Sequence, residues 1–206
     1  DPWLSQDTRD VLDLCTGNGS LAVLAAMAYP DVRVTGADIS ADALAVARLN
    51  VERHGLQTRI ELVESDGLAR CAGPWDLILC NPPYVNAGSM AALPPEYQAE
   101  PALALDGNTA GSHDGMDFIR TLLSDAPRCL KPGGVLVLEI GNEREHFETA
   151  FPQLEAVWQA KGDIINNQLS FADHAIAFKR IQSAEDFATH YPFAPYQFQL
   201  LQKVFE

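Results

Sequence analysis

The chain of 206 residues lacks any long apolar segment. No run reaches the roughly 18 apolar residues that a membrane-spanning helix needs, so we expect no association with a membrane. A positively charged stretch followed by an apolar one, the mark of a secretory leader, does not open the printed sequence. We therefore expect the protein to act in the cytoplasm.

Positive charge is also scarce. Lys and Arg number 14 against 28 Asp and Glu, which gives a formal net charge of −14 at pH 7. Proteins that bind nucleic acids usually present a basic face to the phosphate backbone, so direct binding to nucleic acid is not expected. An acidic surface favours a basic protein as the partner. The composition does not define an oligomeric state.

Cysteine occurs only four times, as Cys15, Cys71, Cys80 and Cys129, and no two of these form a CxxC pair. This spacing favours free thiols packed as small apolar groups, with zinc binding and disulfide formation as alternatives. A P-loop lysine, an HExxH pair and the serine elbow of hydrolases are missing as well. The five histidines share no ligand spacing, so we predict no metal site.

Short apolar runs alternate with helical stretches along the chain, which predicts an α/β fold with a parallel sheet covered by helices. The expected strands are 10–15, 33–38, 59–64, 75–80 and 135–140, and the expected helices are 21–29, 41–54, 115–129 and 143–151. Residues 85–113 are rich in Gly, Pro, Ser, Ala and Asn, which predicts a long functional loop. Residues 131–134 read KPGG and predict a turn before the fifth strand.

A glycine-containing loop, TGNGS, follows the first predicted strand and precedes a helix. Gly17 and Gly19 let the backbone turn tightly and approach a ligand without an intervening side chain. Taken alone, the loop fits a dinucleotide site, a phosphate site or a simple tight turn. It reads GxGxL where dinucleotide enzymes usually read GxGxxG, and no residue pair suggests a pyrophosphate clamp.

Two acidic residues follow the next two strands. Asp38 lies 21 residues after Gly17, where a carboxylate can accept hydrogen bonds from both hydroxyls of a ribose. It can also form part of a helix cap with Ser40, and the two roles can coexist. Asp66 lies where it can accept the exocyclic amine of adenine, or it can form an ordinary Asp-Gly turn. Together these positions favour a nucleoside-binding edge.

The most informative motif is Asn81-Pro82-Pro83-Tyr84 at the end of the fourth predicted strand. An amide nitrogen is a poor nucleophile because its lone pair is delocalised into the carbonyl. An enzyme can counter this by holding both N–H groups with acceptors, and the Asn81 side-chain oxygen and the Pro82 carbonyl suit those roles. The prolines stiffen the loop, and Tyr84 can lie flat against the planar amide. The motif therefore predicts nitrogen methylation that depends mainly on orientation.

These motifs give the chain a clear resemblance to class I methyltransferases, and within them to the protein-(glutamine-N5) methyltransferases. The resemblance covers about residues 11–158 and is carried by DLCTGNGSLAVL, VTGADIS, LILCNPPYV, PPEYQAEPALAL, DGMDFIR and KPGGVLVLEIGNERE. The DLCTG spelling is similar to the branch that acts on ribosomal protein three of the large subunit. The resemblance implies a Rossmann-like doubly wound sheet, S-adenosylmethionine as cofactor, and N5-methylation of a glutamine side chain in a ribosomal protein.

The resemblance also implies roles for individual residues. Those expected to bind the cofactor are Asp13, Cys15, Gly17, Gly19, Asp38, Ile39, Asp66, Gly67 and Asn81. Those expected to bind the substrate are Asn81, Pro82, Pro83, Tyr84, Glu100 and Pro101, and the catalytic residues among them are Asn81, Pro82 and Tyr84.

The chain departs from its relatives at both ends. It starts almost at the first strand, so we expect a methyltransferase core over residues 1–158 without the N-terminal substrate-recognition domain of the relatives. Residues 159–206 are expected to form an atypical, partly helical segment without the two usual closing strands. Two alternatives remain: an N6-adenine DNA methyltransferase, which would have to flip its target base, and a methyltransferase-like module without catalytic activity.

Overall fold

A computed structural model describes residues 7–95, 97–141 and 143–152 of the chain. Apart from the first two residues, the chain divides into two compact units, Trp3–Glu143 and Arg144–Glu206. Within the second unit the described part is helix α6 (Arg144–Ala150) with the two residues after it, and the rings of Phe147 and Phe151 lie 4.9 Å apart between centroids. The segment 159–206 lies outside the described residues, so its predicted character stays a prediction.

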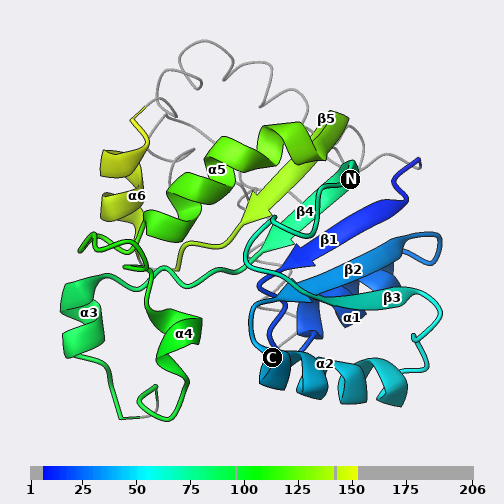
Figure 1. Cartoon of the computed structure of the whole chain (residues 1–206), viewed down its shortest axis with the longest axis horizontal. Helices are drawn as coiled ribbons and strands as arrows, with labels where there is room; N and C mark the ends of the chain where they lie inside the picture. The colour runs from blue at the N-terminus through cyan, green and yellow to red at the C-terminus, as the bar shows by residue number, and fades with distance from the viewer. Residues whose placement is uncertain (1–6, 96, 142, 153–206) are drawn as a thin grey trace, which may run out of the picture. The chain divides into compact units, whose positions relative to one another are not determined.

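Five parallel strands form one sheet in the order β3-β2-β1-β4-β5 (Figure 1). They are β1 (Asp10–Leu14), β2 (Arg33–Asp38), β3 (Ile60–Glu64), β4 (Trp75–Cys80) and β5 (Leu130–Leu138). The order runs outward from β1 to β3 and then reverses to β4 and β5. This reversal confirms the predicted Rossmann-like, doubly wound architecture, and it lies between β1 and β4, whose carboxyl ends are where such sheets bind their ligands.

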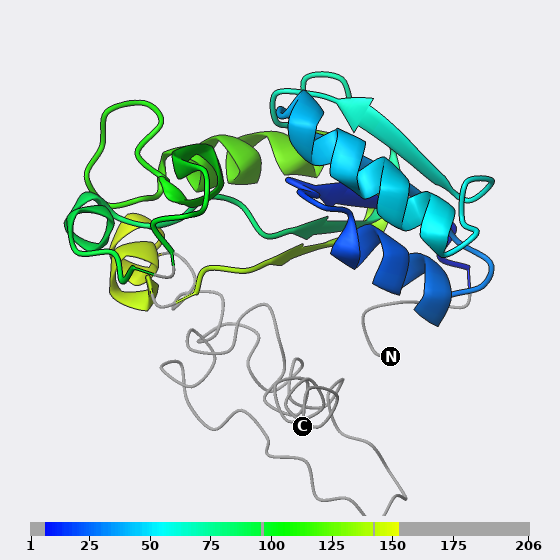
Figure 2. The same cartoon turned by 90° about the horizontal axis from the view of Figure 1, so that it is seen from below.

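Helices cover both faces of the sheet. Helices α1 (Ser20–Ala28) and α2 (Ala41–Arg53) follow β1 and β2, and α5 (Asp117–Cys129) precedes β5. Figure 2 shows α1 and α5 on opposite sides of β1 and β4. Right-handed crossovers explain this, because the two halves of the sheet grow in opposite directions from the centre. Two short helices, α3 (Ala87–Ala91) and α4 (Ala102–Leu105), lie in the long connection between β4 and α5.

Some element boundaries differ from the sequence prediction for local reasons. The first strand ends one residue early because Cys15 has a φ of 59°, and the helix expected from residue 115 begins at Asp117 because Gly115 has a φ of 76°. The KPGG segment lies inside β5, where it bulges: Trp75 pairs with Leu130 but Leu77 pairs with Val135. The four residues 131–134 of β5 thus stand opposite Asp76 alone in β4.

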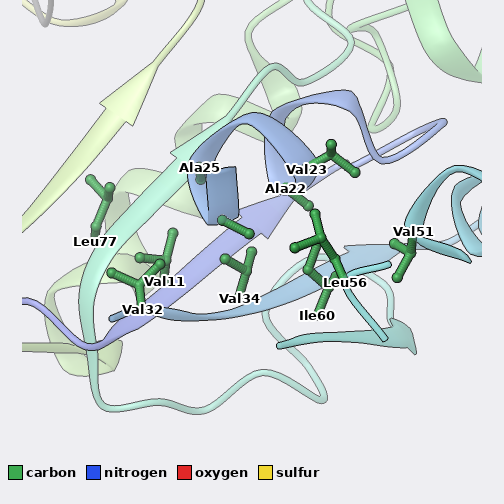
Figure 3. Packing of buried hydrophobic residues seen from close by; sticks show 11 residues of the cluster. Val11, Ala22, Val23, Ala25, Val32, Val34, Val51, Leu56, Ile60 and Leu77 are labelled. Carbon is green, nitrogen blue, oxygen red and sulfur yellow. The ribbon is translucent and has the colours of Figure 1, made fainter. Parts of the chain in front are cut away.

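The main core lies between the sheet and the α1–α2 layer (Figure 3). It is built from small and β-branched side chains: Val11, Ala22, Val23, Ala25, Ala26, Val32, Val34, Val51, Leu56, Ile60 and Leu77. Burying such side chains contributes about 25 cal/mol for each Å² of apolar surface removed from water. Because the strands rest on this packed layer, the loops at their carboxyl ends start from rigid positions.

A charged cluster lies at the amino-terminal ends of β1 and β4. The Lys131 ammonium donates to Asp10 at 2.7 Å and to Asp76 at 2.8 Å, and Asp76 also accepts from the backbone N–H of Arg9 and of Asp10. These contacts tie the starts of β1 and β4 to β5. They lie at the other end of β4 from Asn81 and are purely structural interactions.

Candidate functional site

The sequence-predicted residues of four loops meet at the carboxyl edge of the sheet. Leu14 and Cys80 are Cα partners in neighbouring strands, which places the loop after β1 beside Asn81. The Thr16 N–H donates to the Ala37 carbonyl at 2.9 Å, and the Ser65 N–H donates to the Asp38 carbonyl at 2.9 Å. Neighbouring loops are thus joined by backbone hydrogen bonds, so the glycine loop, Asp38 and Asn81 share one edge as predicted.

Asp13 is fully buried on β1 and organises the glycine loop. It shares a strand face with Val11, so its side chain points toward α1. One carboxylate oxygen, Oδ2, accepts from the Thr16 hydroxyl and from the Ala22 N–H, whereas Oδ1 is buried without a hydrogen-bond partner in the described structure. Burial raises the pKa of Asp13 to about 6, despite these two donors, and Asp38 adds to the rise.

The glycine loop leaves an open approach to its backbone. Gly17 has a φ of 55°, and a Cβ built on it would meet no atom within 4 Å. Gly19, with a φ of 80°, precedes α1, and a Cβ there would lie 3.0 Å from the Cβ of Ala47 on α2. The first glycine therefore leaves room for a ligand, and the second permits close packing of α1 against α2.

Asp38 holds two pieces of the edge together. Its Oδ2 accepts from the Gly17 N–H at 2.8 Å, and its Oδ1 accepts from the Ser40 N–H at 2.9 Å. Ser40 in turn caps α2 through the Ala43 N–H, as predicted. Each carboxylate oxygen keeps a further lone pair for a ligand hydroxyl. The next residue, Ile39, exposes 47% of its surface, an apolar side chain beside this carboxylate.

Asp66 and Gly67 form the turn after β3. The Asp66 carboxylate is exposed and has no hydrogen-bond partner in the described part of the chain. The turn is fixed by its neighbour Ser65, which is buried, donates to the Gly67 carbonyl at 2.8 Å and accepts from the Arg70 N–H at 3.0 Å. The ordered turn after β3 thus leaves the Asp66 carboxylate exposed at the carboxyl edge of the sheet.

Asn81 is exposed, and its side-chain amide has no hydrogen-bond partner among the described residues. Pro82 is fully buried, so the loop that carries Asn81 is anchored by its second residue. Tyr84 is half-buried and packs over Gly141, where a Cβ would lie 2.5–2.7 Å from the Tyr84 ring and hydroxyl. The Asn81 amide is therefore accessible to a ligand, while Pro82 and Tyr84 in the same loop are held by packing.

Negative charge surrounds Tyr84. Burial raises the pKa of Tyr84, and the nearby Glu139, Glu143 and Glu100 add to the rise. Glu100 and Pro101 are exposed, and Pro101 precedes α4. The predicted substrate residue Glu100 therefore lies near enough to Tyr84 to act on its titration.

The cysteines are free thiols in the structure, as predicted. Cys71, Cys80 and Cys129 are buried, and Cys15 is partly exposed beside the glycine loop. Burial, followed by the neighbouring Cys15 thiol, raises the pKa of Cys80 well above its usual value. The described residues contain no cluster of three or more His, Cys, Asp or Glu that could hold a metal ion. Among these same residues no helix has the length and apolar character to span a membrane.

Sequence reasoning did not single out several residues of the site. Thr16 and Ser65 are small polar residues in turns, and their local hydrogen bonds to Asp13 and Gly67 leave no distinctive pattern in the sequence. Asn108 and Glu143 were also missed, because they reach Val85 and Asn86 from distant parts of the chain.

The edge fits S-adenosylmethionine by two observations. The unpaired Asp13 Oδ1 lies beneath a loop whose Gly17 backbone is open, and a buried carboxylate oxygen favours a cationic group such as the ammonium of a methionine moiety. Asp38 and Ile39 then offer a carboxylate to ribose hydroxyls and an apolar surface to adenine.

Comparisons with known proteins show what the chain is similar to. Residues 3–95 match the family described as Methyltransferase small domain. The chain is 52% identical over 160 residues to the ribosomal protein uL3 glutamine methyltransferase of Bordetella pertussis, and 52% identical over 156 residues to that of Burkholderia pseudomallei. The match to the Neisseria gonorrhoeae protein of the same description is 45% over 159 residues.

These matches cover 76%, 72% and 76% of this chain and 52%, 50% and 52% of the three relatives, in the same order. The chain therefore spans about half the length of the curated relatives it matches. A crystal structure of a methyltransferase from Pyrococcus furiosus covers 84% of this chain and 69% of its own, at 20% identity and a TM-score of 0.48. The sheet order gives the described residues a Rossmann-like, doubly wound fold, and the family match lies on the part of the chain that holds the glycine loop, Asp38 and Asn81.

Proposed function

We propose that this chain carries the catalytic core of an S-adenosylmethionine-dependent enzyme that methylates the side-chain amide nitrogen of a glutamine in ribosomal protein uL3. The observation that carries the proposal is the exposed Asn81 amide beside the glycine loop, which has no hydrogen-bond partner among the described residues. The relatives named as uL3 glutamine methyltransferases supply the substrate. A ribosomal protein substrate also favours action in the cytoplasm.

In this proposal the cofactor, when bound, supplies an electrophilic methyl group on a sulfonium. Asp13 would hold its ammonium, Asp38 its ribose, and Asp66 its adenine amine. Asn81 and the Pro82 carbonyl accept from the two N–H groups of the glutamine amide and turn its nitrogen toward the methyl group. Tyr84 supports the amide plane as an uncharged phenol, because its pKa is raised.

The negative charges around Tyr84 fit the proposed partner. Glu100, Glu139 and Glu143 are all close enough to raise the pKa of Tyr84. Proteins that bind ribosomal RNA are basic, so segments next to the target glutamine would be attracted to this rim. No general base is required at the amide, because the nitrogen loses its proton to solvent after methyl transfer.

Two experiments test the proposal. Calorimetric titration of the chain with S-adenosylmethionine should show binding, and Asp38→Ala should weaken it by about 1–3 kcal/mol, as expected for lost charge-assisted hydrogen bonds. Incubation with methyl-labelled cofactor should label recombinant uL3 and leave double-stranded DNA unlabelled. Labelling of DNA alone would replace the proposal with an adenine methyltransferase. Cofactor binding without labelling of either would leave a binding module.

A further inference from the structure

The backbone that leaves the Asn-Pro-Pro-Tyr motif is held by a distant loop, residues 105–117. The Val85 N–H donates to the Leu105 carbonyl at 2.8 Å. The Val85 carbonyl accepts twice, from the Gly107 N–H at 3.1 Å and from the Asn108 side-chain amide at 3.2 Å. Both polar backbone groups of Val85, next to Tyr84, are thus fixed by this loop.

The Asn108 side chain forms hydrogen bonds to several parts of that loop. Besides Val85, its Nδ2 donates to the Asp106 carboxylate at 2.6 Å, and its Oδ1 accepts from the Gly115 N–H at 2.9 Å. Gly115 lies directly against Tyr84, since a Cβ on it would stand 2.2 Å from the Tyr84 carbonyl oxygen. Asn108 therefore holds two backbone segments that flank the carboxyl side of the motif.

A second hold comes from the turn after β5. Glu143 exposes only 7% of its surface, and its carboxylate accepts from the Asn86 side-chain amide at 2.6 Å and from the Asn86 backbone N–H at 3.3 Å. Asn86 also caps α3 through the Ser89 N–H at 2.9 Å. Asn108 from one loop and Glu143 from another therefore both form hydrogen bonds to the segment after Tyr84.

We infer that Asn108 and Glu143 are positioning residues for methyl transfer: they fix the Tyr84–Asn86 backbone so that the motif presents its acceptors to the amide in one orientation. This inference rests on the proposed function. It follows from the chemistry, because orientation of nitrogen, methyl and sulfur carries the reaction, and a misplacement of about 1 Å can lower a rate about 100-fold.

The position of the two residues makes the expected effect selective. Asn108 and Glu143 form side-chain hydrogen bonds to the segments 85–86 and 106–115, whereas hydrogen bonds from Thr16, Ala22, Ser40 and Ser65 hold the cofactor residues. Loss of either positioning residue should therefore disturb the amide site without disturbing the cofactor edge.

The test compares Asn108→Ala, Asn108→Asp, Glu143→Ala and Glu143→Gln with Asp76→Asn as the matched control. Asn108→Asp keeps an acceptor for Gly115 but removes the donor to Val85. Glu143→Gln keeps one acceptor for Asn86. Asp76→Asn weakens a similar network of backbone and side-chain bonds at the far end of β4. Each protein is assayed for its melting temperature, its Kd for S-adenosylmethionine and its kcat with uL3.

We expect both Asn108 variants and Glu143→Ala to lower kcat at least tenfold while the Kd for the cofactor stays within twofold, and we expect Glu143→Gln to recover part of the rate. Asp76→Asn should lower the melting temperature and keep kcat. Rates within twofold of the wild type in the folded variants would overturn the inference. So would a joint loss of rate and cofactor affinity that matches the loss of folded protein.

Failure of the proposed function gives a different result. A wild-type chain that transfers no methyl group to uL3 refutes the function and the inference with it. A wild-type chain that methylates uL3 while the Asn108 and Glu143 variants keep its rate refutes the inference alone. If the Asn108 variants do not fold, the Glu143 pair still decides the outcome.

Discussion

At the scale of single residues, Asp13 combines an anchoring role with a free charge. Its Oδ2 fastens the glycine loop to α1, and its buried Oδ1 has no partner in the described residues. A carboxyl group is tolerated there without ligand because it is partly protonated near pH 6. The same oxygen would gain most from a cation, which links the loop's stability to its occupancy.

Asp13→Asn should separate these two effects. The pKa of Asp13 is raised from 3.8 to about 6, so the unliganded protein loses about 3 kcal/mol of stability as the pH rises through that interval, and the loss persists above it. The amide keeps an acceptor for Thr16 and Ala22 and carries no charge. Urea unfolding between pH 5 and 7 should therefore show a falling stability for the wild type and a flat one for the variant.

The same substitution should weaken binding of the cofactor. At pH 7.5 Asp13→Asn should weaken S-adenosylmethionine binding about tenfold in calorimetry, because the ammonium loses its counter-charge. An unchanged Kd would show that Asp13 serves the loop alone.

Asn81 differs from Asp13 in having no structural partner among the described residues. Asn81→Ala should therefore leave the melting temperature and the cofactor Kd unchanged and lower methyl transfer to uL3 about 100-fold or more. Labelled-cofactor assays at saturating cofactor provide the rate. Transfer within a few-fold of the wild type would remove Asn81 from the mechanism.

At the scale of elements, the turn after β5 supports the aromatic ring of the motif. Gly141 has a φ of 53°, and a Cβ on it would overlap the Tyr84 ring. Gly141→Ala should displace the ring and lower kcat about tenfold or more, with little effect on cofactor binding.

Gly133→Ala is the matched control for that change. Gly133 has a φ of 79° in the β5 bulge, and a Cβ there would meet no atom within 4 Å. Both substitutions impose the cost of a side chain at positive φ, about 1 kcal/mol, but only one touches Tyr84. Equal rates for the two variants, measured with uL3, would show that the Tyr84 position does not control transfer.

At the scale of the whole molecule, the excess of acidic residues should govern the encounter with a basic substrate. The chain carries a net charge of −14, and screening shortens the range of its field to about 8 Å at physiological ionic strength. The KM for uL3 should rise several-fold between 50 and 300 mM NaCl, while the Kd for S-adenosylmethionine, held by short-range contacts, should change less than twofold. A salt-independent KM would argue against electrostatic recruitment.

Local patterns in the sequence were sufficient to predict the order and type of the strands in the described residues. Short runs with apolar residues, bounded by turn residues, gave β2 and β4 at their observed limits. The motif spacings placed Gly17, Asp38 and Asn81 on one edge, because the carboxyl ends of parallel strands must coincide. The roles assigned to these residues stay predictions until ligand binding is measured.

Only the tertiary structure decided which groups support that edge. The bulge in β5, the buried Oδ1 of Asp13, and the holds of Asn108 and Glu143 on Val85 and Asn86 depend on contacts between residues far apart in the chain. Sequence determines strand and loop character through short-range preferences of a few residues. Register, burial and long-range hydrogen bonds arise only when the strands have paired, because each depends on where every other element lies.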